Sequence, residues 1–285
     1  MVIFMDNRKL AEMWLSDYGQ HLKIEGRSAG TIEKYLRDTR AFAKWLNGQA
    51  VTNERLYAWK AYLQDKGYSP ATINSMLAAL NNLFRFLGWE ECRVKFLKVQ
   101  RRMFRDRSRE LSRAEYERLL SCAKGQGQSR LALLMETICG TGIRVSEVKY
   151  TTVEAARCGQ TEISLKGKIR TILLPKKLAR KLLQFAVKSK TTHGEIFITS
   201  SGKSLSRRQI WAEMKRLCRA AGVMPSKVFP HNLRHLFATV FYKTCKDIVR
   251  LADVLGHSSI ETTRIYLLTS GEEHRRQLER LRLVQ

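Results

Sequence analysis

Hydrophobic spacing predicts helices throughout the first hundred residues. The segment that begins at Ile73 carries apolar residues at the spacing of one helical face: Ile73, Met76, Leu77, Leu80, Phe84 and Leu87. Ser69 and Pro70 are suited to the N-cap and the first helical position, and Gly88 is suited to the end. This segment is therefore predicted to be an amphipathic helix.

A second helix start resembles the first. The heptapeptide Gly26-Arg-Ser-Ala-Gly-Thr-Ile32 is similar to Gly67-Tyr-Ser-Pro-Ala-Thr-Ile73, and apolar residues again follow at helical spacing. Two copies are too few for a repeat array, so we interpret them as two similar helix starts. With further helices near 7–24 and 53–66, the pattern predicts a small four-helix bundle.

The rest of the chain has a mixed pattern. Helical spacing covers 115–123, 129–139 and 177–188, and it returns from Ser206 onward. Between Glu162 and Pro175 the residues alternate on both sides of Gly167, which predicts a β-hairpin with its turn at 166–168. The expected fold is mostly α with a small antiparallel β-sheet: a helical bundle followed by a mixed α/β domain.

Charge separates the two parts and points to a polyanion as partner. The 285 residues include 52 Lys and Arg against 26 Asp and Glu, a net charge of +26. Residues 1–100 hold 15 basic and 10 acidic residues, whereas 101–285 hold 37 and 16. The Arg-rich stretch 98–110, with Arg101 and Arg102, is predicted to be an exposed linker between domains at 1–97 and 111–285.

Several classes of protein are disfavoured. Charges interrupt every apolar stretch before the roughly 18 residues that a membrane span needs, and the N-terminus lacks the pattern of a secretory signal. The six cysteines are widely spaced, without a Cys-x-x-Cys pair, which argues against a zinc site or a disulfide framework. We expect a cytosolic protein with no metal and no cofactor.

Four separate segments carry candidate chemistry. They are Thr141–Val148 with Arg144, the hairpin tip with Lys166 and Lys168, Pro230–Thr239 with His231 and Arg234, and Leu255–Tyr266 with His257 and Tyr266. Each is ordinary by itself, as a surface arginine, a solvated lysine, a helix-start histidine or a core tyrosine. In the third, Pro230 is expected to begin a helix that places His231 and Arg234 on one face.

In the first segment, Gly140 and Gly142 are expected to break a helix before Arg144 opens the next. In the last, Gly256 is expected to end a helix, and Ser258 with Glu261 matches a capping box. His257 would then lie in a tight turn between two helices.

Together the four segments offer every group needed to open a phosphodiester without metal. Two guanidinium groups can neutralise the non-bridging oxygens, a tyrosine hydroxyl can attack phosphorus, a histidine can handle its proton, and a lysine can protonate the departing oxygen.

The motifs, in this order, closely resemble the tyrosine recombinase family, also called phage integrases. The resemblance rests on Thr141-Gly-Ile-Arg-Val-Ser-Glu147, His231-Asn-Leu-Arg-His-Leu-Phe-Ala-Thr239 and Leu255-Gly-His-Ser-Ser-Ile-Glu-Thr-Thr-Arg-Ile-Tyr266, and it spans nearly the whole chain. It is greatest with compact members of Xer or mobile-element type, which have only a SAM-like core-binding domain and a catalytic domain. We therefore expect no separate arm-binding domain.

The resemblance implies a role for each motif residue. Arg144 and Arg234 would clamp the scissile phosphate, Tyr266 would form a 3′-phosphotyrosyl link, and His257 would hydrogen-bond the phosphate. Lys166 would be the general acid, His231 a general acid/base, and Glu147 a structural residue behind the first arginine. No ATP or metal would be needed.

Two departures from the family pattern affect this assignment. The hairpin Leu165-Lys166-Gly167-Lys168 is one residue shorter than the usual turn, so Lys168 remains an alternative to Lys166. Residues 149–158 also lack the family's Trp/Asp pattern.

The resemblance further implies a partner and an assembly. Double-stranded DNA would be bound by a homotetramer on two recombination sites through a Holliday junction, with a monomer or dimer off DNA and an accessory protein both left open. The Arg-rich linker would cross the DNA backbone and contact DNA through Arg101 and Arg102. The helix near 207–219 would meet DNA through Arg207, Arg208 and Lys215, by base edges or by phosphates alone. A tail helix after Ser270, which family members often dock onto a neighbouring protomer, would follow Tyr266.

Two alternatives remain at this point: a type IB topoisomerase and a non-catalytic DNA-binding protein. The Xer-like helical domain and the short tail argue against the topoisomerase, and the intact catalytic groups argue against the binding protein. The target site, and the choice among integration, excision, resolution and inversion, are open.

Overall fold

The computed structural model describes residues 8–10, 12–99, 107–165, 168–266 and 271–281. The chain divides into two compact units, Met1–Arg101 and Arg102–Gln285. The expected linker at 98–110 includes this division, but residues 100–106, with Arg101 and Arg102, lie outside the described residues. The placement of the linker stays a prediction.

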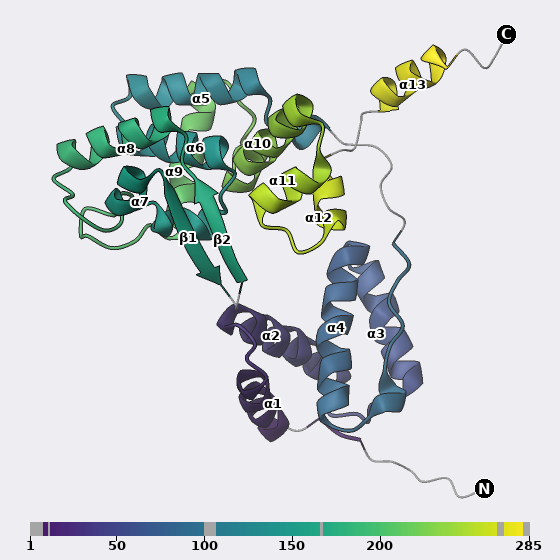
Figure 1. The fold of residues 1–285 in the computed structure, drawn as a ribbon. Coiled ribbons are helices and arrows are strands. Elements are labelled where there is room, and N and C mark those ends of the chain that lie inside the picture. The colour runs from purple at the N-terminus through teal and green to yellow at the C-terminus, as the bar shows by residue number, and fades with distance from the viewer. Residues whose placement is uncertain (1–7, 11, 100–106, 166–167, 267–270, 282–285) are drawn as a thin grey trace, which may run out of the picture. The chain divides into compact units, whose positions relative to one another are not determined.

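The first unit is a bundle of four helices, shown in purple and blue in Figure 1. They are α1 (Glu12–Ile24), α2 (Ala29–Leu46), α3 (Asn53–Asp65) and α4 (Pro70–Phe86), followed by the short 3₁₀ helix η1 (Glu90–Cys92). Helix α4 contacts each of the other three. Ile73, Leu77, Leu80 and Phe84 on its predicted apolar face are almost completely buried, whereas Met76 and Leu87 at the edge of that face are partly buried.

The two similar helix starts fold alike. Ser28 and Ser69 have extended backbones and accept hydrogen bonds from the backbone N–H groups of Thr31 and Thr72, respectively. Each serine therefore satisfies a donor that the first helical turn leaves free. The sequence echo is confirmed as a local capping device.

The chain leaves this bundle along α4. Asn81 donates from Nδ2 to the carbonyl of Val94 (3.0 Å) and accepts from its N–H (2.8 Å). Asn74, two helical turns earlier, makes the same pair of bonds with Leu97. Two side-chain amides thus hold an extended segment much as a neighbouring strand would.

The second unit is mostly helical around α6. Its first part contains η2 (Arg107–Arg109), α5 (Arg113–Gly125), α6 (Ser129–Thr141), η3 (Val145–Tyr150), α7 (Val153–Cys158), β1 (Gln160–Leu165), β2 (Lys168–Leu173) and α8 (Lys176–Lys188). Helix α6 contacts α5, α8, α9 and α10, and most of its side chains are buried. It is the centre of the larger hydrophobic core.

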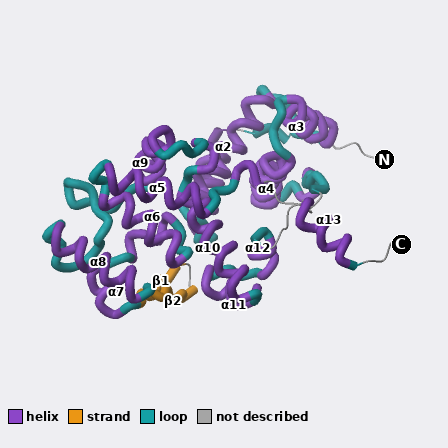
Figure 2. The backbone as a smooth tube through the Cα atoms, turned by 90° about the horizontal axis from the view of Figure 1, so that it is seen from above, coloured by secondary structure: helices purple, strands orange, loops and turns teal. Residues whose placement is uncertain are grey.

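The second part of this unit carries the remaining helices. They are α9 (Arg207–Ala220), η4 (Pro225–Lys227), α10 (Pro230–Cys245), α11 (Ile248–Leu255), α12 (Ile260–Arg264) and α13 (Gly271–Arg280). The expected mostly-α architecture is confirmed, and Figure 2 shows the β1–β2 hairpin as the strand content of the described chain. The strands are antiparallel, with Ile163 opposite Arg170 and Leu165 opposite Lys168. The turn residues 166–167 lie outside the description.

Candidate active site

Arg144 stands at the junction of α6 and η3. Helix α6 continues through Gly140, contrary to the expected break there, and ends at Gly142 with φ +68°. A Cβ at position 142 would lie 2.4 Å from Cδ1 of Phe237, so both the conformation and the packing require glycine. Arg144 then forms the N-cap of η3, as expected, although the next helix is 3₁₀.

Arg234 lies on the inner face of α10 and is only 3% exposed. Pro230 occupies the first turn of this helix, as predicted. The guanidinium donates from Nη1 to the carbonyl of Gly142 (2.5 Å) and from Nη2 to that of Leu255 (2.8 Å). Burial, together with the charges of Arg144 and Arg170, lowers the pKa of Arg234 to about 10, so it remains cationic at neutral pH.

His257 lies in the turn between α11 and α12, as expected. Its Nε2 is 2.9 Å from Nη2 of Arg234, and its Nδ1 is 2.9 Å from Oγ1 of Thr263. Because a guanidinium only donates, Nε2 accepts, and Nδ1 carries the proton and donates to Thr263. Burial and the charge of Arg234 lower the pKa of His257 to about 4, so the ring is neutral at pH 7.

The predicted capping box of this turn is wrong by one residue. Gly256, with φ +62°, and His257 complete the end of α11, since the N–H of His257 bonds to the carbonyl of Ala252 (3.0 Å). The N-cap of α12 is therefore Ser259, whose hydroxyl accepts from the N–H of Glu261 (3.3 Å), and not Ser258.

Tyr266 and His231 complete the group. Tyr266 is 3% exposed, and its ring lies edge-on to His235 (4.8 Å between centroids) and parallel to His257 (6.1 Å). His231 is exposed at the start of α10, and partial burial with the charge of Arg234 lowers its pKa. A cavity of about 810 Å³ is lined by Arg144, His231, Arg234, His257 and Tyr266 together. Five predicted site residues from separate segments thus meet at one place.

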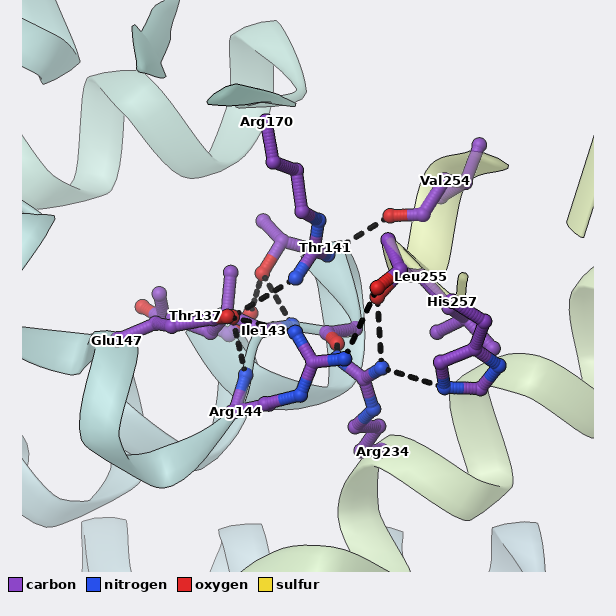
Figure 3. A network of polar contacts seen from close by, with 12 residues as sticks. Thr137, Thr141, Ile143, Arg144, Glu147, Arg170, Arg234, Val254, Leu255 and His257 are labelled. Atoms are coloured by element: carbon purple, nitrogen blue, oxygen red, sulfur yellow. Dashed lines mark hydrogen bonds and ion pairs between the residues drawn. The ribbon is translucent and has the colours of Figure 1, made fainter. Parts of the chain in front are cut away.

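Glu147 and Arg170, which are not among the residues lining this cavity, form a largely buried ion pair (Figure 3). Glu147, only 2% exposed, accepts from the backbone N–H and Nη1 of Arg144 and from Nη1 of Arg170, each at 2.8 Å. Burial alone would raise the pKa of Glu147, but the hydrogen bonds from Arg144 and the two positive charges lower it overall. The structural position expected for Glu147 fits this geometry, whereas Arg170 and Thr263 were not predicted from the sequence.

The role expected for the hairpin lysines stays a prediction. Lys166 lies outside the described residues, and Lys168 is described only as the first residue of β2. Lys166 therefore remains the predicted general acid, with Lys168 as the alternative.

The candidate DNA-contacting residues of α9 differ in position. Arg207 and Arg208 are exposed and line the cavity, together with the half-exposed Trp211, which sequence reasoning missed. Lys215 lies two turns along the helix, with its ammonium 5.2 Å from the ring centre of Trp211 and bonded to the carbonyl of Pro225. Arg207 and Arg208 are therefore the better placed for a ligand at the cavity.

None of the helices in the described part of the chain is long and apolar enough to cross a membrane. Among the same residues, no three His, Cys, Asp or Glu side chains gather as they would around a metal ion.

Two family models match this chain. The phage integrase family model matches residues 109–272, and the model for the phage integrase N-terminal SAM-like domain matches residues 15–91. The chain belongs to the phage integrase family. These proteins are the tyrosine recombinases, and the chain is an enzyme of site-specific DNA recombination.

Individual relatives agree with this assignment. Tyrosine recombinase XerA of Thermococcus kodakarensis is 30% identical over 281 residues, which cover 95% of this chain and 96% of the relative. Tyrosine recombinase XerD of Proteus mirabilis is 29% identical over 87% of this chain and 85% of the relative. This recombinase is thus similar to Xer proteins along almost its whole length.

Solved structures share the fold. A lambda integrase tetramer bound to a Holliday junction has a TM-score of 0.73 at 19% identity, covering 92% of this chain and 78% of that one. XerH bound to its difH substrate in a pre-cleavage complex has a TM-score of 0.68 at 20% identity, with 95% and 85% covered.

Proposed function

We propose that this recombinase breaks and rejoins DNA strands with Tyr266 as nucleophile. One observation carries the proposal: the same cavity is lined by residues from three separate segments of the chain, namely Arg144, then His231 and Arg234, then His257 and Tyr266. A merely structural tyrosine would not need two arginines and two histidines around the space it faces. The cavity offers a pair of cations, proton carriers and a hydroxyl, which is the set that opens a phosphodiester.

Arg144 and Arg234 bind the scissile phosphate. Each guanidinium now donates to a backbone carbonyl, Arg144 to Gly256 (3.1 Å) and Arg234 to Leu255 (2.8 Å). A phosphate oxygen is a stronger acceptor for a charged donor than a carbonyl is, so DNA can draw these donors into the cavity. Two positive charges then offset the charge that develops on the non-bridging oxygens.

The bond changes in the proposed cleavage step balance without a high-energy cofactor. The Tyr266 oxygen attacks phosphorus and loses its proton to His231, while the bond between phosphorus and the 5′-oxygen breaks. The departing 5′-oxygen takes a proton from Lys166, and the 3′-phosphate stays on the tyrosine. Because this link preserves the phosphodiester energy, a 5′-hydroxyl from another strand can reverse the step without ATP.

His257 orients the phosphate from the side of α11. Its neutral ring lies beside Arg234, and Nε2 accepts a hydrogen bond from that guanidinium. A bound phosphate would take the place of His257 as the acceptor for Arg234. Once Arg234 turns to the phosphate, the ring is free to hydrogen-bond a phosphate oxygen through its other tautomer.

Double-stranded DNA is the substrate, and its binding is strongly electrostatic. The net charge of +26 and the exposed Arg207 and Arg208 at the cavity support this proposal. The structural similarity to a lambda integrase tetramer on a Holliday junction supports a tetramer acting on two sites. We further propose that the protein works in the cytoplasm at the nucleoid, where its substrate lies.

The test is covalent capture on a nicked half-site. Duplexes that bind the protein are first selected from a random library, and a nick is placed near the cleavage position so that the released fragment diffuses away. Wild type is expected to give a protein–DNA adduct on a denaturing gel, with or without EDTA. Tyr266→Phe is expected to give none, whereas Tyr242→Phe, a variant of a tyrosine beside the same apolar cluster, keeps the adduct. An adduct that persists in both variants would overturn the assignment of Tyr266 as the nucleophile.

A further inference from the structure

We propose that Arg170 is a positioning residue for DNA cleavage, acting through Arg144 and the turn that carries His257. The inference rests on the proposed function of those residues. Arg170 lies on β2, opposite Ile163, and its side chain is 10% exposed. It does not line the cavity within the described part of the chain, so it acts from behind the site.

Arg170 joins two elements that are distant in the sequence. Its Nη1 donates to Oε2 of Glu147 in η3 (2.8 Å), and its Nη2 donates to the carbonyl of Val254 at the end of α11 (2.7 Å). The planar guanidinium presents both donors in a fixed geometry, which a lysine cannot reproduce. One side chain therefore sets the distance between η3 and α11 (Figure 3).

The first element orients Arg144. Glu147 receives Arg170 on Oε2 and the Nη1 of Arg144 on Oε1, so the carboxylate connects the two guanidinium groups. Glu147 is only 2% exposed, so its negative charge depends on the two guanidinium groups for compensation. Removal of Arg170 would take away one of these two positive charges. Glu147 would then be expected to draw Arg144 inward, away from a phosphate.

The second element orients His257. Three successive carbonyls at the end of α11, those of Val254, Leu255 and Gly256, accept from Arg170, Arg234 and Arg144 respectively. The C-terminus of a helix carries partial negative charge, which favours cations there. Arg144 and Arg234 can leave their carbonyls for a phosphate, whereas Arg170, behind the cavity, stays and holds the helix end in place.

Packing reinforces the same contact. A Cβ at Gly256 would lie 2.3 Å from Cδ of Arg170, so the stem of the arginine lies directly against the glycine that precedes His257. Gly256 also has φ +62°, a conformation that disfavours other residues. The close contact between Arg170 and Gly256 therefore fixes the position of the His257 turn relative to β2.

The test separates positioning from simple stabilisation. Arg170→Met, Arg144→Lys and the double variant are compared with wild type by single-turnover cleavage of the nicked half-site at saturating protein, by gel-shift Kd and by thermal unfolding. For Arg170→Met we expect a loss of cleavage rate of about 100-fold, as for a misplacement of about 1 Å, with Kd changed less than about 3-fold. Because part of the effect of Arg170 passes through Arg144, the double variant should be less impaired than the product of the two single losses, while the part that acts through the His257 turn remains.

Two further variants keep the result interpretable. Arg170→Lys retains the charge beside Glu147 but cannot span both acceptors, so it should fold and still cleave at least about 10-fold more slowly than wild type. Arg130→Met is the matched control, since Arg130 bridges Glu213 and the carbonyl of Ile198 away from the cavity. The fold-loss of cleavage rate in the double variant Arg130→Met/Arg144→Lys should equal the product of the two single fold-losses.

Three outcomes would overturn the inference: wild-type cleavage by Arg170→Lys, equal losses of rate and Kd in Arg170→Met, or a double variant whose loss equals the product of the single losses. Formation of the adduct by the wild-type protein in the same gel tests the proposed function. This test does not depend on the behaviour of any Arg170 variant.

Discussion

Nη2 of Arg234 donates to Nε2 of His257 across 2.9 Å, which joins α10 to the turn between α11 and α12. The bond requires a neutral imidazole, because a protonated ring has no lone pair to accept it. Protonation of His257 therefore works against the assembled site.

The first prediction concerns pH. The pKa of His257 is lowered to about 4 in the folded protein, against about 6.5 in an unfolded chain. The unfolded chain thus binds the extra proton between these values, so this contribution to the free energy of unfolding is complete above about pH 6.5 and is lost as pH falls toward 4. His257→Gln, which keeps an acceptor but does not titrate, should show a flatter decline of unfolding temperature with falling pH.

The exposed His193, which lies outside the cavity, supplies the control for that measurement. His193→Gln should retain the wild-type slope. Parallel pH curves for wild type and His257→Gln would show that the imidazole does not contribute in this way.

A second prediction compares two glycines. Gly142 and Gly159 both have positive φ, +68° and +74°, but a Cβ at 142 would collide with Phe237 whereas none would be met at 159. We expect Gly159→Ala to cost about 1 to 2 kcal/mol from backbone strain, and Gly142→Ala about 2 to 5 kcal/mol because overpacking adds to it. Chemical denaturation of both variants measures the difference, and equal costs would contradict the packing argument.

A third prediction concerns salt. If Arg207 and Arg208 contact phosphates, each change to alanine should reduce the slope of log K against log salt by about 1 and weaken all sequences alike. If they read base edges instead, the selected half-site should lose affinity more than random DNA does. Arg180→Ala, on the exposed face of α8 away from the cavity, is the control and should leave the slope unchanged.

The tail supplies a fourth prediction. Leu278 in α13 and Leu281 just after it are 55% and 58% exposed, so the tail presents apolar side chains to solvent. Deletion after Leu268 should weaken recombination between two sites more than it weakens binding to one half-site, because a docked tail acts only in the assembly. Gel-shift and recombination assays run side by side decide this, and losses of equal size would argue against it.

Local signals in the sequence were enough to predict most helices and their caps. Ser28 and Ser69 accept hydrogen bonds from backbone N–H groups only three residues away, so their role as N-caps can be predicted from the local sequence alone. The one-residue error at Ser258 has the opposite cause. His257 is held by Arg234, 23 residues earlier, and this contact and the end of α11 move the next cap to Ser259.

Arg170 shows what the pattern could not reveal. The hairpin is apolar on both faces: Ile163 and Ile172 are buried, yet Ile169 and Leu173 are 73% and 68% exposed. Alternation alone therefore did not say which face is inward. Arg170 lies on the same face of the hairpin as the buried Ile172, and an arginine on a buried face needs a partner. That partner, Glu147, lies 23 residues earlier in the sequence, and only the fold brings the two together.

The central claim is that Tyr266 carries the DNA during strand exchange. The most direct measurement is mass spectrometry of peptides from the wild-type adduct trapped on a nicked half-site, after nuclease digestion of the DNA. We predict one modified peptide, with a nucleotide joined through its 3′-phosphate to Tyr266. A nucleotide attached to any other residue, Tyr242 included, or through its 5′-phosphate, would contradict the account.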